Sequence, residues 1–326
     1  MPTSPPTTPR VAEAFHEPRR ENCPWCGGGN LRTRARAAAP GPADPGAFVV
    51  DQCRDCGHAF QNPRLTAEGL AHHLGLFSGQ LDDFAERVLS SRAVHRRHRA
   101  AARTILPLAE PESWLDVGTG HGRFPQTAKE VFPYTSFDGL DPTPRVEQAL
   151  QEERIEEAHI GDLTDPRVLA RLRSRYDVVS MFHHLGHTPD PRAELRAALA
   201  TLRPGGHLIL ELPDPRSAFA ALLGNWWLPY GQPRHLHLLP QANLCAELAS
   251  RGCEILITDR RAPHIPYDLS AALTIALTRV PAPLRRAAAP LTATASAVDH
   301  ALGPLLRRTR FSNAYRIVAR KAERST

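Results

Sequence analysis

The sequence predicts an α/β fold, in which helices cover both faces of a mostly parallel, seven-stranded sheet, with a small cysteine-rich module ahead of it. Three observations predict this fold. A short apolar strand runs into three alternating glycines within residues 115–124. More apolar strands follow, and helix-like segments separate them, as is typical of a parallel sheet. Two Cys-x-x-Cys pairs precede this pattern, and 326 residues suffice for one full domain and a smaller module.

The first 18 residues are predicted to form a disordered tail. They begin MPTSPPTTPR and have no apolar centre, so we do not expect a signal peptide. No apolar run in the chain approaches the ~20 residues that a membrane span needs. Together with a hydrophobic content of 42%, this predicts a cytoplasmic protein without membrane contact.

Residues 19–64 are predicted to form a zinc ribbon. A glycine follows each Cys-x-x-Cys pair, which permits the tight turns of two metal-binding knuckles. Disulfides are the alternative, but no secretory signal indicates an oxidising compartment. Four thiolates can close a tetrahedral structural Zn²⁺ site, while His58 and the two later cysteines, Cys245 and Cys253, receive no ligand role. The predicted ligands are Cys23, Cys26, Cys53 and Cys56.

Residues 65–110 are predicted to form a helical connector and a candidate lid. The next segment, residues 111–326, holds the predicted sheet. Its first strand contains Asp116 and ends at the glycines Gly118, Gly120 and Gly122. Glycines at a strand end allow a tight turn and let a nucleotide-like ligand approach the backbone.

The second and third strands are each predicted to end at a carboxylate. The second runs from Tyr134 to Leu140 and is followed by Asp141, while Asp162 follows the third. Ligands of parallel sheets bind at the carboxyl ends of the strands. We therefore expect one ligand to meet both groups, with Asp141 suited to a ribose diol and Asp162 to an adenine amine.

Histidines gather after the fourth and fifth predicted strands, which span 176–182 and end near 213. A histidine near neutral pKa can act as a general base. His235 is the first candidate, and His183 or His184 is the second. Aromatic residues between 213 and 237 are predicted to wall a substrate pocket, and a catalytic metal held by the histidines is the alternative.

The final part of the chain is predicted to form a hairpin with a helical insertion at about 268–310. The last strand, 313–321, is expected to run antiparallel to its neighbours. Residues 279–326 hold ten basic and two acidic side chains, in a chain whose net charge is +6. A basic segment of this kind could contact nucleic acid, phosphate or a membrane surface. Because 38 of the 40 basic residues of the chain are arginine, compositional bias is the favoured explanation. We expect packing against the core or another subunit here.

Five motifs resemble those of class I S-adenosylmethionine-dependent methyltransferases, which have a Rossmann-like fold. They lie within residues 105–260 and read LDVGTGHGRF, GLDPTP, GDLTD, YDVVSMFHHLGHTPDP and LRPGGHLILELP. The resemblance implies that Gly118, Gly120 and Gly122 cradle the methionine end of the cofactor and that Asp116 orients its amino group. Asp141 would hold the ribose and Asp162 the adenine amine. A dinucleotide site would need G-x-G-x-x-G, but position 123 is Arg.

The combination with a zinc ribbon resembles a narrower group, the bacterial small-molecule methyltransferases of natural-product and sugar pathways. Residues 53–63 read C-x-x-C-G-x-x-F-x-N-P, and residues 230–236 hold a Y…H-L segment. The resemblance implies a small-molecule acceptor. The alternatives are a zinc-ribbon ribosomal RNA methyltransferase and a non-catalytic interaction protein that retains the fold. The sequence leaves open the oligomeric state and whether oxygen, nitrogen or carbon is methylated.

Overall fold

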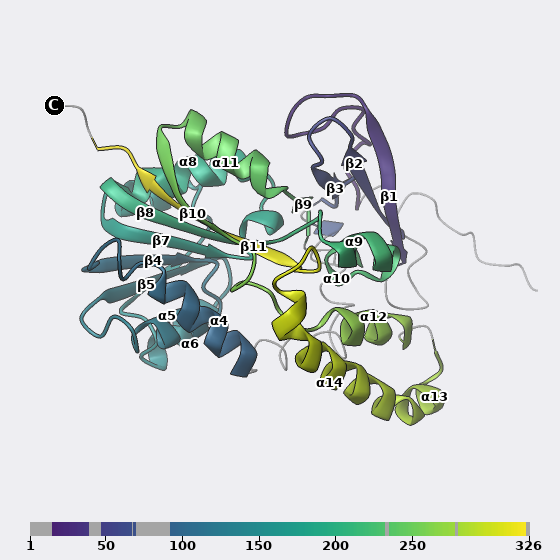
Figure 1. The fold of residues 1–326 in the computed structure, drawn as a ribbon. Helices are drawn as coiled ribbons and strands as arrows, with labels where there is room; N and C mark the ends of the chain where they lie inside the picture. The colour runs from purple at the N-terminus through teal and green to yellow at the C-terminus, as the bar shows by residue number, and fades with distance from the viewer. Residues whose placement is uncertain are drawn as a thin grey trace, which may run out of the picture.

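A computed structural model describes residues 15–38, 47–66, 68–69, 92–231, 235–277 and 280–323. Seven strands form the central sheet in the order β10-β11-β8-β7-β4-β5-β6 (Figure 1). Six of the strands are parallel, and β11 runs antiparallel between β8 and β10. This confirms the predicted fold. The strands are β4 (Ser113–Val117), β5 (Ser136–Asp141), β6 (Glu157–Ile160), β7 (Tyr176–Phe182), β8 (Leu202–Pro213), β10 (Cys253–Asp259) and β11 (Ala314–Lys321).

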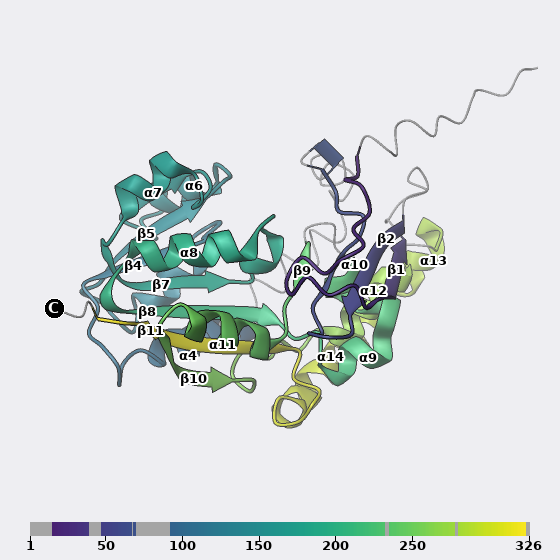
Figure 2. The same ribbon diagram turned by 90° about the horizontal axis from the view of Figure 1, so that it is seen from above.

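Helices cover both faces of this sheet (Figure 2). Neighbouring residues of one strand point to opposite faces, so Trp114 packs in the cluster that contains α4 and α5, whereas Leu115 packs in the cluster that contains α7, α8 and α11. Asp190 caps α8 by accepting hydrogen bonds from the amides of Arg192 and Ala193. The helices are α4 (Arg92–Arg103), α5 (Arg123–Ala128), α6 (Arg145–Gln151), α7 (Pro166–Leu172), α8 (Pro191–Thr201) and α11 (Gln241–Ser250).

Two predicted boundaries are wrong. The second strand of the sheet starts at Ser136 rather than at Tyr134, which is 98% exposed. The predicted disordered tail of 18 residues is also too long, because residues 15–18 are described and contact the chain near Arg64. There the amide of Glu17 donates to the Arg64 carbonyl at 2.7 Å, and their side chains form an ion pair at 2.5 Å. Residues 1–14 lie outside the described residues.

The cysteine module, described at residues 15–38 and 47–66, contributes three strands to a second sheet. These are β1 (Leu31–Ala38), β2 (Ala47–Cys53) and β3 (Ala59–Gln61). The fourth strand, β9 (His237–Leu238), comes from far along the chain and pairs with β3. The module is therefore joined to the large domain by a shared sheet.

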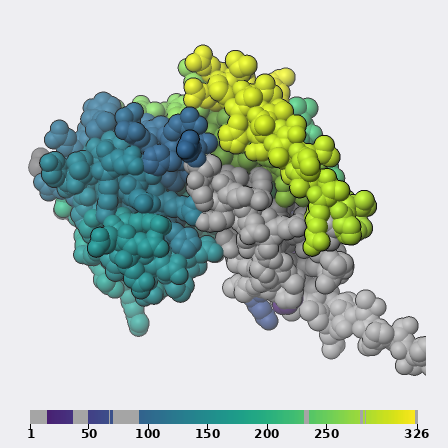
Figure 3. Space-filling view, turned by 90° about the horizontal axis from the view of Figure 1, so that it is seen from below, coloured from purple at the N-terminus to yellow at the C-terminus, as the bar shows by residue number. Residues whose placement is uncertain are grey.

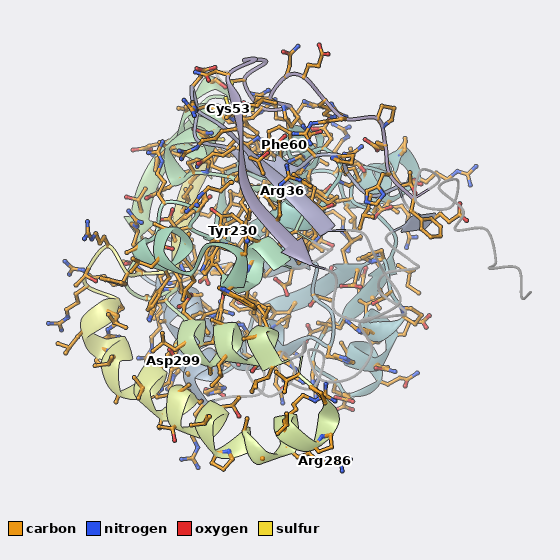
Figure 4. All side chains as sticks on the ribbon, turned by 90° about the vertical axis from the view of Figure 1, so that its right-hand side faces the viewer. Arg36, Cys53, Phe60, Tyr230, Arg286 and Asp299 are labelled. Atoms are coloured by element: carbon orange, nitrogen blue, oxygen red, sulfur yellow. The ribbon has the colours of Figure 1, made fainter. Side chains whose placement is uncertain are left out.

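The aromatic segment after β8 packs against this second sheet. It forms α9 (Ala218–Leu223), the 3₁₀ turn η2 (Gly224–Trp226) and α10 (Leu228–Gly231). The sequence predicted that its aromatic residues wall a substrate pocket. Instead, Phe219, Trp227 and Tyr230 are buried in a core with Val50 and Leu238, and Tyr230 lies beside the strands of the module (Figure 4). Only Trp226 of the predicted set is half-exposed.

Three helices lie between β10 and β11. They are α12 (Asp268–Leu277), α13 (Ala282–Ala287) and α14 (Ala289–Leu306). Pro281 precedes α13, and Pro290 lies in the first turn of α14, so both prolines fall at helix starts. In the part of the chain that the structure describes, no helix has the length and apolar character to cross a membrane. Most of the predicted connector, residues 67 and 70–91, lies outside the described residues, and α4 forms its last part.

Candidate functional site

The three glycines after β4 all adopt left-handed backbone conformations, with φ of 75° at Gly118, 51° at Gly120 and 67° at Gly122. A Cβ at Gly118 would lie 2.6 Å from Nδ1 of His184, and one at Gly122 would lie 2.9 Å from Cβ of Ala149. At Gly120 a Cβ would meet no atom within 4 Å. The loop therefore packs tightly at its two ends and leaves open space in the middle, where a ligand could approach the backbone.

Asp116 lies buried at the carboxyl end of β4. Its Oδ1 accepts a hydrogen bond of 2.6 Å from the hydroxyl of Ser180. The Ser180 hydroxyl oxygen in turn accepts a hydrogen bond of 2.9 Å from Nε1 of Trp114. Burial raises the pKa of the Asp116 carboxyl to about 7. This carboxyl can therefore change charge near neutral pH, depending on what binds beside it.

Asp141 connects the end of β5 to the glycine loop. Its Oδ2 accepts from the amide of Gly120 at 2.9 Å, and its Oδ1 accepts from both the amide and the hydroxyl of Thr143, at 2.9 and 2.6 Å. Asp162 follows β6 on the neighbouring strand and is exposed. The structure thus places both predicted carboxylates at the same sheet edge as the glycines, but Asp141 also holds the loop in shape.

His184 is held by a buried carboxylate. Its Nε2 lies 2.9 Å from Oε1 of Glu194, a buried residue of α8. Because the carboxylate accepts, Nε2 donates, and the lone pair of the neutral ring is then on Nδ1. That Nδ1 is the atom that faces Gly118. A histidine oriented in this way has a proton-accepting atom at the glycine loop.

His183 has the opposite arrangement. Its backbone is left-handed, with φ of 56°, and its Nε2 lies 2.6 Å from Nη1 of Arg97. A guanidinium only donates, so this Nε2 must accept. Burial, followed by the charge of Arg97, lowers the pKa of His183 well below its usual value. His183 is therefore neutral and its Nε2 lone pair is already engaged.

A buried ionic group lies behind His183. Nη1 of Arg97 is 3.4 Å from Oε2 of Glu211, whose Oε1 accepts from Nε of Arg316 at 2.7 Å. These three side chains come from α4, β8 and β11 and are almost completely buried. The group brings together two guanidinium charges and one carboxylate.

His235 lies across the loop that follows β7. Its ring packs edge-on against His187, with ring centroids 4.7 Å apart. Next to it, the amide of Leu236 donates to the carbonyl of Gly186 at 2.9 Å. We call residues 183–190 the histidine loop. Two of the candidate bases, His183 and His184, lie in this loop, and the third, His235, packs against it.

The four cysteines of the two knuckles form one cluster, with their Sγ atoms within 4.8 Å of one another. Cys23 and Cys56 are 3.7 Å apart, and Cys26 and Cys53 are 3.6 Å apart. Four sulfurs around Zn²⁺ at about 2.3 Å would be separated by about 3.8 Å. The donor set and the spacing both fit a tetrahedral zinc site.

A chain of contacts runs from this cluster to the histidine loop. Sγ of Cys23 is 3.5 Å from Nδ1 of His58, whose Nε2 is 3.2 Å from Nδ1 of His237. Nε2 of His237 in turn lies 3.3 Å from the carbonyl oxygen of Pro189. His58 was given no role from the sequence, but here it links the cluster to the large domain.

Comparison with known proteins identifies the family. A family model described as a methyltransferase domain matches residues 89–257. The chain belongs to this family of methyltransferases. The ubiquinone biosynthesis O-methyltransferase of Aeromonas salmonicida is 27% identical over 158 residues, which are 46% of this chain and 65% of that protein. The Salmonella arizonae protein of the same name is 25% identical over 158 residues, 47% of this chain and 65% of that one.

The fold is shared with solved structures. In a complex of a Haloferax volcanii methyltransferase activator with a methyltransferase, the matching chain has a TM-score of 0.51 and 17% identity. The match covers 74% of this chain and 96% of that chain. At this identity the likeness concerns the fold alone. The chain thus combines a methyltransferase domain of Rossmann-like fold with a four-cysteine cluster.

The methyltransferase has site residues that the sequence did not reveal. Glu194 lies within an ordinary helix, and Arg97 precedes the sheet in an arginine-rich stretch. Neither position belongs to a motif, and no sequence signal joins them to His184 and His183. His58 offered a weak signal, because it follows Cys56 by two residues.

Proposed function

We propose that this methyltransferase transfers a methyl group from S-adenosylmethionine to a hydroxyl group of a small molecule, with His184 as general base. The observation that carries the proposal is the pair of His184 and Glu194, which directs Nδ1 of the histidine at Gly118. A carboxylate that fixes a histidine in one tautomer is a recurrent arrangement for proton acceptance.

The cofactor would lie along the carboxyl ends of β4, β5 and β6. The open space at Gly120 supports this, because the neighbouring glycines pack tightly and this one does not. Asp116 would face the amino group, Asp141 the ribose and Asp162 the adenine amine, while Gly118, Gly120 and Gly122 would cradle the methionine end. When bound, S-adenosylmethionine supplies an electrophilic methyl group on a sulfonium.

His184 suits the role of base better than the other two candidates. Arg97 already occupies the Nε2 lone pair of His183, so that atom cannot take a proton without losing a short hydrogen bond. His235, our first candidate from the sequence, packs against the ring of His187, whereas the ring of His184 is the one that meets Gly118. In our proposal His183 shapes the loop, and His235 contacts the acceptor.

The acceptor is proposed to be a small molecule of secondary-metabolite or sugar type. The matching O-methyltransferases of ubiquinone biosynthesis support an oxygen acceptor, although this chain covers 65% of their length. Two arginines of the ribbon are engaged within the protein, which weakens the argument for RNA. Arg32 donates to Gln52, and Arg34 donates to the carbonyl of Ala220, so both guanidinium groups are engaged within the protein.

Zn²⁺ is proposed as a structural ion of the cysteine module. Cys23, Cys26, Cys53 and Cys56 would hold it, and four protein ligands leave no open position for catalysis. The ion would stabilise a module too small to fold on its apolar core.

The proposal is tested by calorimetry and by product formation. We expect S-adenosylmethionine to bind the purified protein, and S-adenosylhomocysteine to form with members of a panel of phenols and hydroxylated metabolites. His184→Gln should lower turnover by roughly 10²–10⁴-fold without weakening cofactor binding. His235→Gln is the matched comparison and should mainly raise KM.

Three results would contradict the proposal. Unchanged turnover in His184→Gln would place the base elsewhere. Tight, salt-dependent binding of ribosomal RNA would favour the RNA methyltransferase. A folded protein without affinity for S-adenosylmethionine would indicate an interaction protein that retains the fold.

A further inference from the structure

Helix α14 presents an uncharged surface to solvent. The 20 residues from Ala287 to Leu306 contain one charged side chain, Asp299. At the average of 23% charged residues in this chain, about four or five would be expected. The helix is nevertheless exposed along its length and lies on the surface of the molecule (Figure 3). Surface helices of soluble proteins normally carry charged residues on the outer side.

The single charged residue, Asp299, determines which side of α14 faces the protein. Asp299 is buried, and its two carboxylate oxygens accept the amides of Leu269 and Ser270 at the start of α12, at 3.0 and 2.9 Å. One turn further on, Gly303 allows close contact with Pro266, where a Cβ would lie 3.3 Å from the proline ring. Asp299 and Gly303 therefore face the protein, and Leu306 at the end of the helix also packs against the core.

Four of the larger apolar side chains of α14 face solvent. Leu291 is 61% exposed and Leu305 is 67% exposed, and two partly exposed apolar residues lie between them. The spacings of seven, four and three residues place all four on one side of the helix. We call this set the leucine stripe: Leu291, Val298, Leu302 and Leu305. A helix of 18 residues is about 27 Å long.

Arginines lie at both ends of the leucine stripe. Arg285 and Arg286 precede α14, and Arg286 lies at the end of this helical segment (Figure 4). Arg307, Arg308 and Arg310 follow the helix. Of these five arginines, Arg285 is half-buried and the other four are exposed. The surface thus combines a central apolar stripe with positive charge at each end.

This charge distribution selects among the possible occupants. A second copy of the chain would bring arginines against arginines whether the two helices met parallel or antiparallel, which is unfavourable. Nucleic acid would leave the leucines without apolar contact. A lipid surface with anionic headgroups offers both an apolar layer for the leucines and negative charge for the arginines.

We propose that α14 docks the methyltransferase on an anionic lipid surface. The helix lies parallel to that surface, the leucine stripe enters the boundary between headgroups and acyl chains, and the flanking arginines contact headgroup phosphates. This goes beyond the proposed methyl transfer and does not depend on it. It also revises the expectation from sequence that this segment only packs against protein: the inner side of α14 packs against α12, and the outer side is the docking surface.

The test measures binding of the full chain to vesicles by flotation. Vesicles contain phosphatidylcholine alone or phosphatidylcholine with phosphatidylglycerol. We expect binding to the anionic vesicles, weaker at high salt, and none to phosphatidylcholine alone. Leu291→Glu with Leu305→Glu should weaken binding by at least about tenfold, because two apolar side chains no longer enter the lipid. Arg285→Gln, Arg286→Gln and Arg308→Gln together should weaken it about a hundredfold.

A matched control is Leu150→Glu, which changes a leucine of α6 that is 40% exposed and lies near the opposite edge of the sheet. It should bind as the wild type does, and thermal melting should show that every variant is folded. Failure of the wild type to bind anionic vesicles at low salt would overturn the proposal, as would unchanged binding in the leucine variant. A wild-type dimer that the leucine substitutions convert to a monomer would instead assign the stripe to a second copy.

Discussion

Two neighbouring histidines, His183 and His184, follow β7 and differ in what holds them. Glu194 accepts a hydrogen bond from the ring of His184, whereas Arg97 donates one to the ring of His183. A carboxylate leaves a histidine able to take a second proton, but a guanidinium prevents it. The chemistry expected of each ring therefore depends on a partner far away in the sequence, and the pair would be indistinguishable from the chain alone.

Asp116 gives a prediction on pH. Burial raises its pKa from the usual 3.8 to about 7 in the folded protein, so this group favours folding most below pH 4 and loses that contribution as pH rises through 7. If the carboxylate pairs with the cofactor ammonium, the affinity for S-adenosylmethionine should rise with pH up to about 7, and should fall again where the cofactor's amino group loses its proton, near pH 8. Calorimetry across this range measures the effect. Asp116→Asn should abolish it, and a flat profile in the wild type would exclude the pairing.

The glycine loop gives a second prediction. Gly120→Ala should destabilise folding by only about 1–2 kcal/mol, because its left-handed backbone is strained but its Cβ meets no atom. It should nevertheless lose most cofactor affinity. Gly118→Ala should lose both stability and affinity, because its Cβ would collide with His184. Thermal melting with and without S-adenosylmethionine separates the two effects, and full cofactor affinity in Gly120→Ala would argue against a ligand at this position.

At the scale of elements, the strands of the central sheet and the glycine turn after β4 could be predicted, because apolar runs and glycines are signals that lie within the strand or turn itself. The four cysteines were predictable for the same reason, since their spacing is itself the signal. Strand β9 could not be predicted, because two residues acquire strand geometry only by pairing with β3. The aromatic residues near Tyr230 were misassigned to a substrate wall, because sequence does not reveal that the cysteine module covers them.

The contact between the cysteine module and the histidine loop gives a third prediction. His237 and Arg64 both contact the carbonyl of Pro189, and Arg192 stacks over Trp25 at 4.3 Å. Removing zinc with a chelator should therefore speed amide hydrogen exchange in residues 183–190 as well as in the module. Strand β4 should be unaffected and is the internal control. Unchanged exchange in the histidine loop would show that the loop holds its position without the ion.

At the scale of the whole molecule, Glu211 joins three separate parts of the chain. It contacts Arg97 of α4 and Arg316 of β11 from its own place in β8. Glu211→Gln should destabilise folding by about 3–5 kcal/mol, because it leaves two buried guanidinium groups without a counter-charge. Urea denaturation measures this. Glu254→Gln is the matched control, since Glu254 pairs with Arg320 at an exposed site and should change stability by less than about 1 kcal/mol. Equal effects in both variants would contradict the argument.

The shared sheet has a consequence for the order in which the protein can form. Gln61 and its neighbours in β3 receive their last partner only when residues 237–238 exist, roughly three quarters of the way along the chain. During synthesis from the amino terminus, β3 therefore waits with an unpaired edge while the central strands β4 to β8 emerge. An unpaired edge is a template for pairing with other chains. A protein cut after residue 64 keeps all four cysteines and this unpaired edge. It should therefore aggregate more than the full chain does, and less with Zn²⁺ than without it.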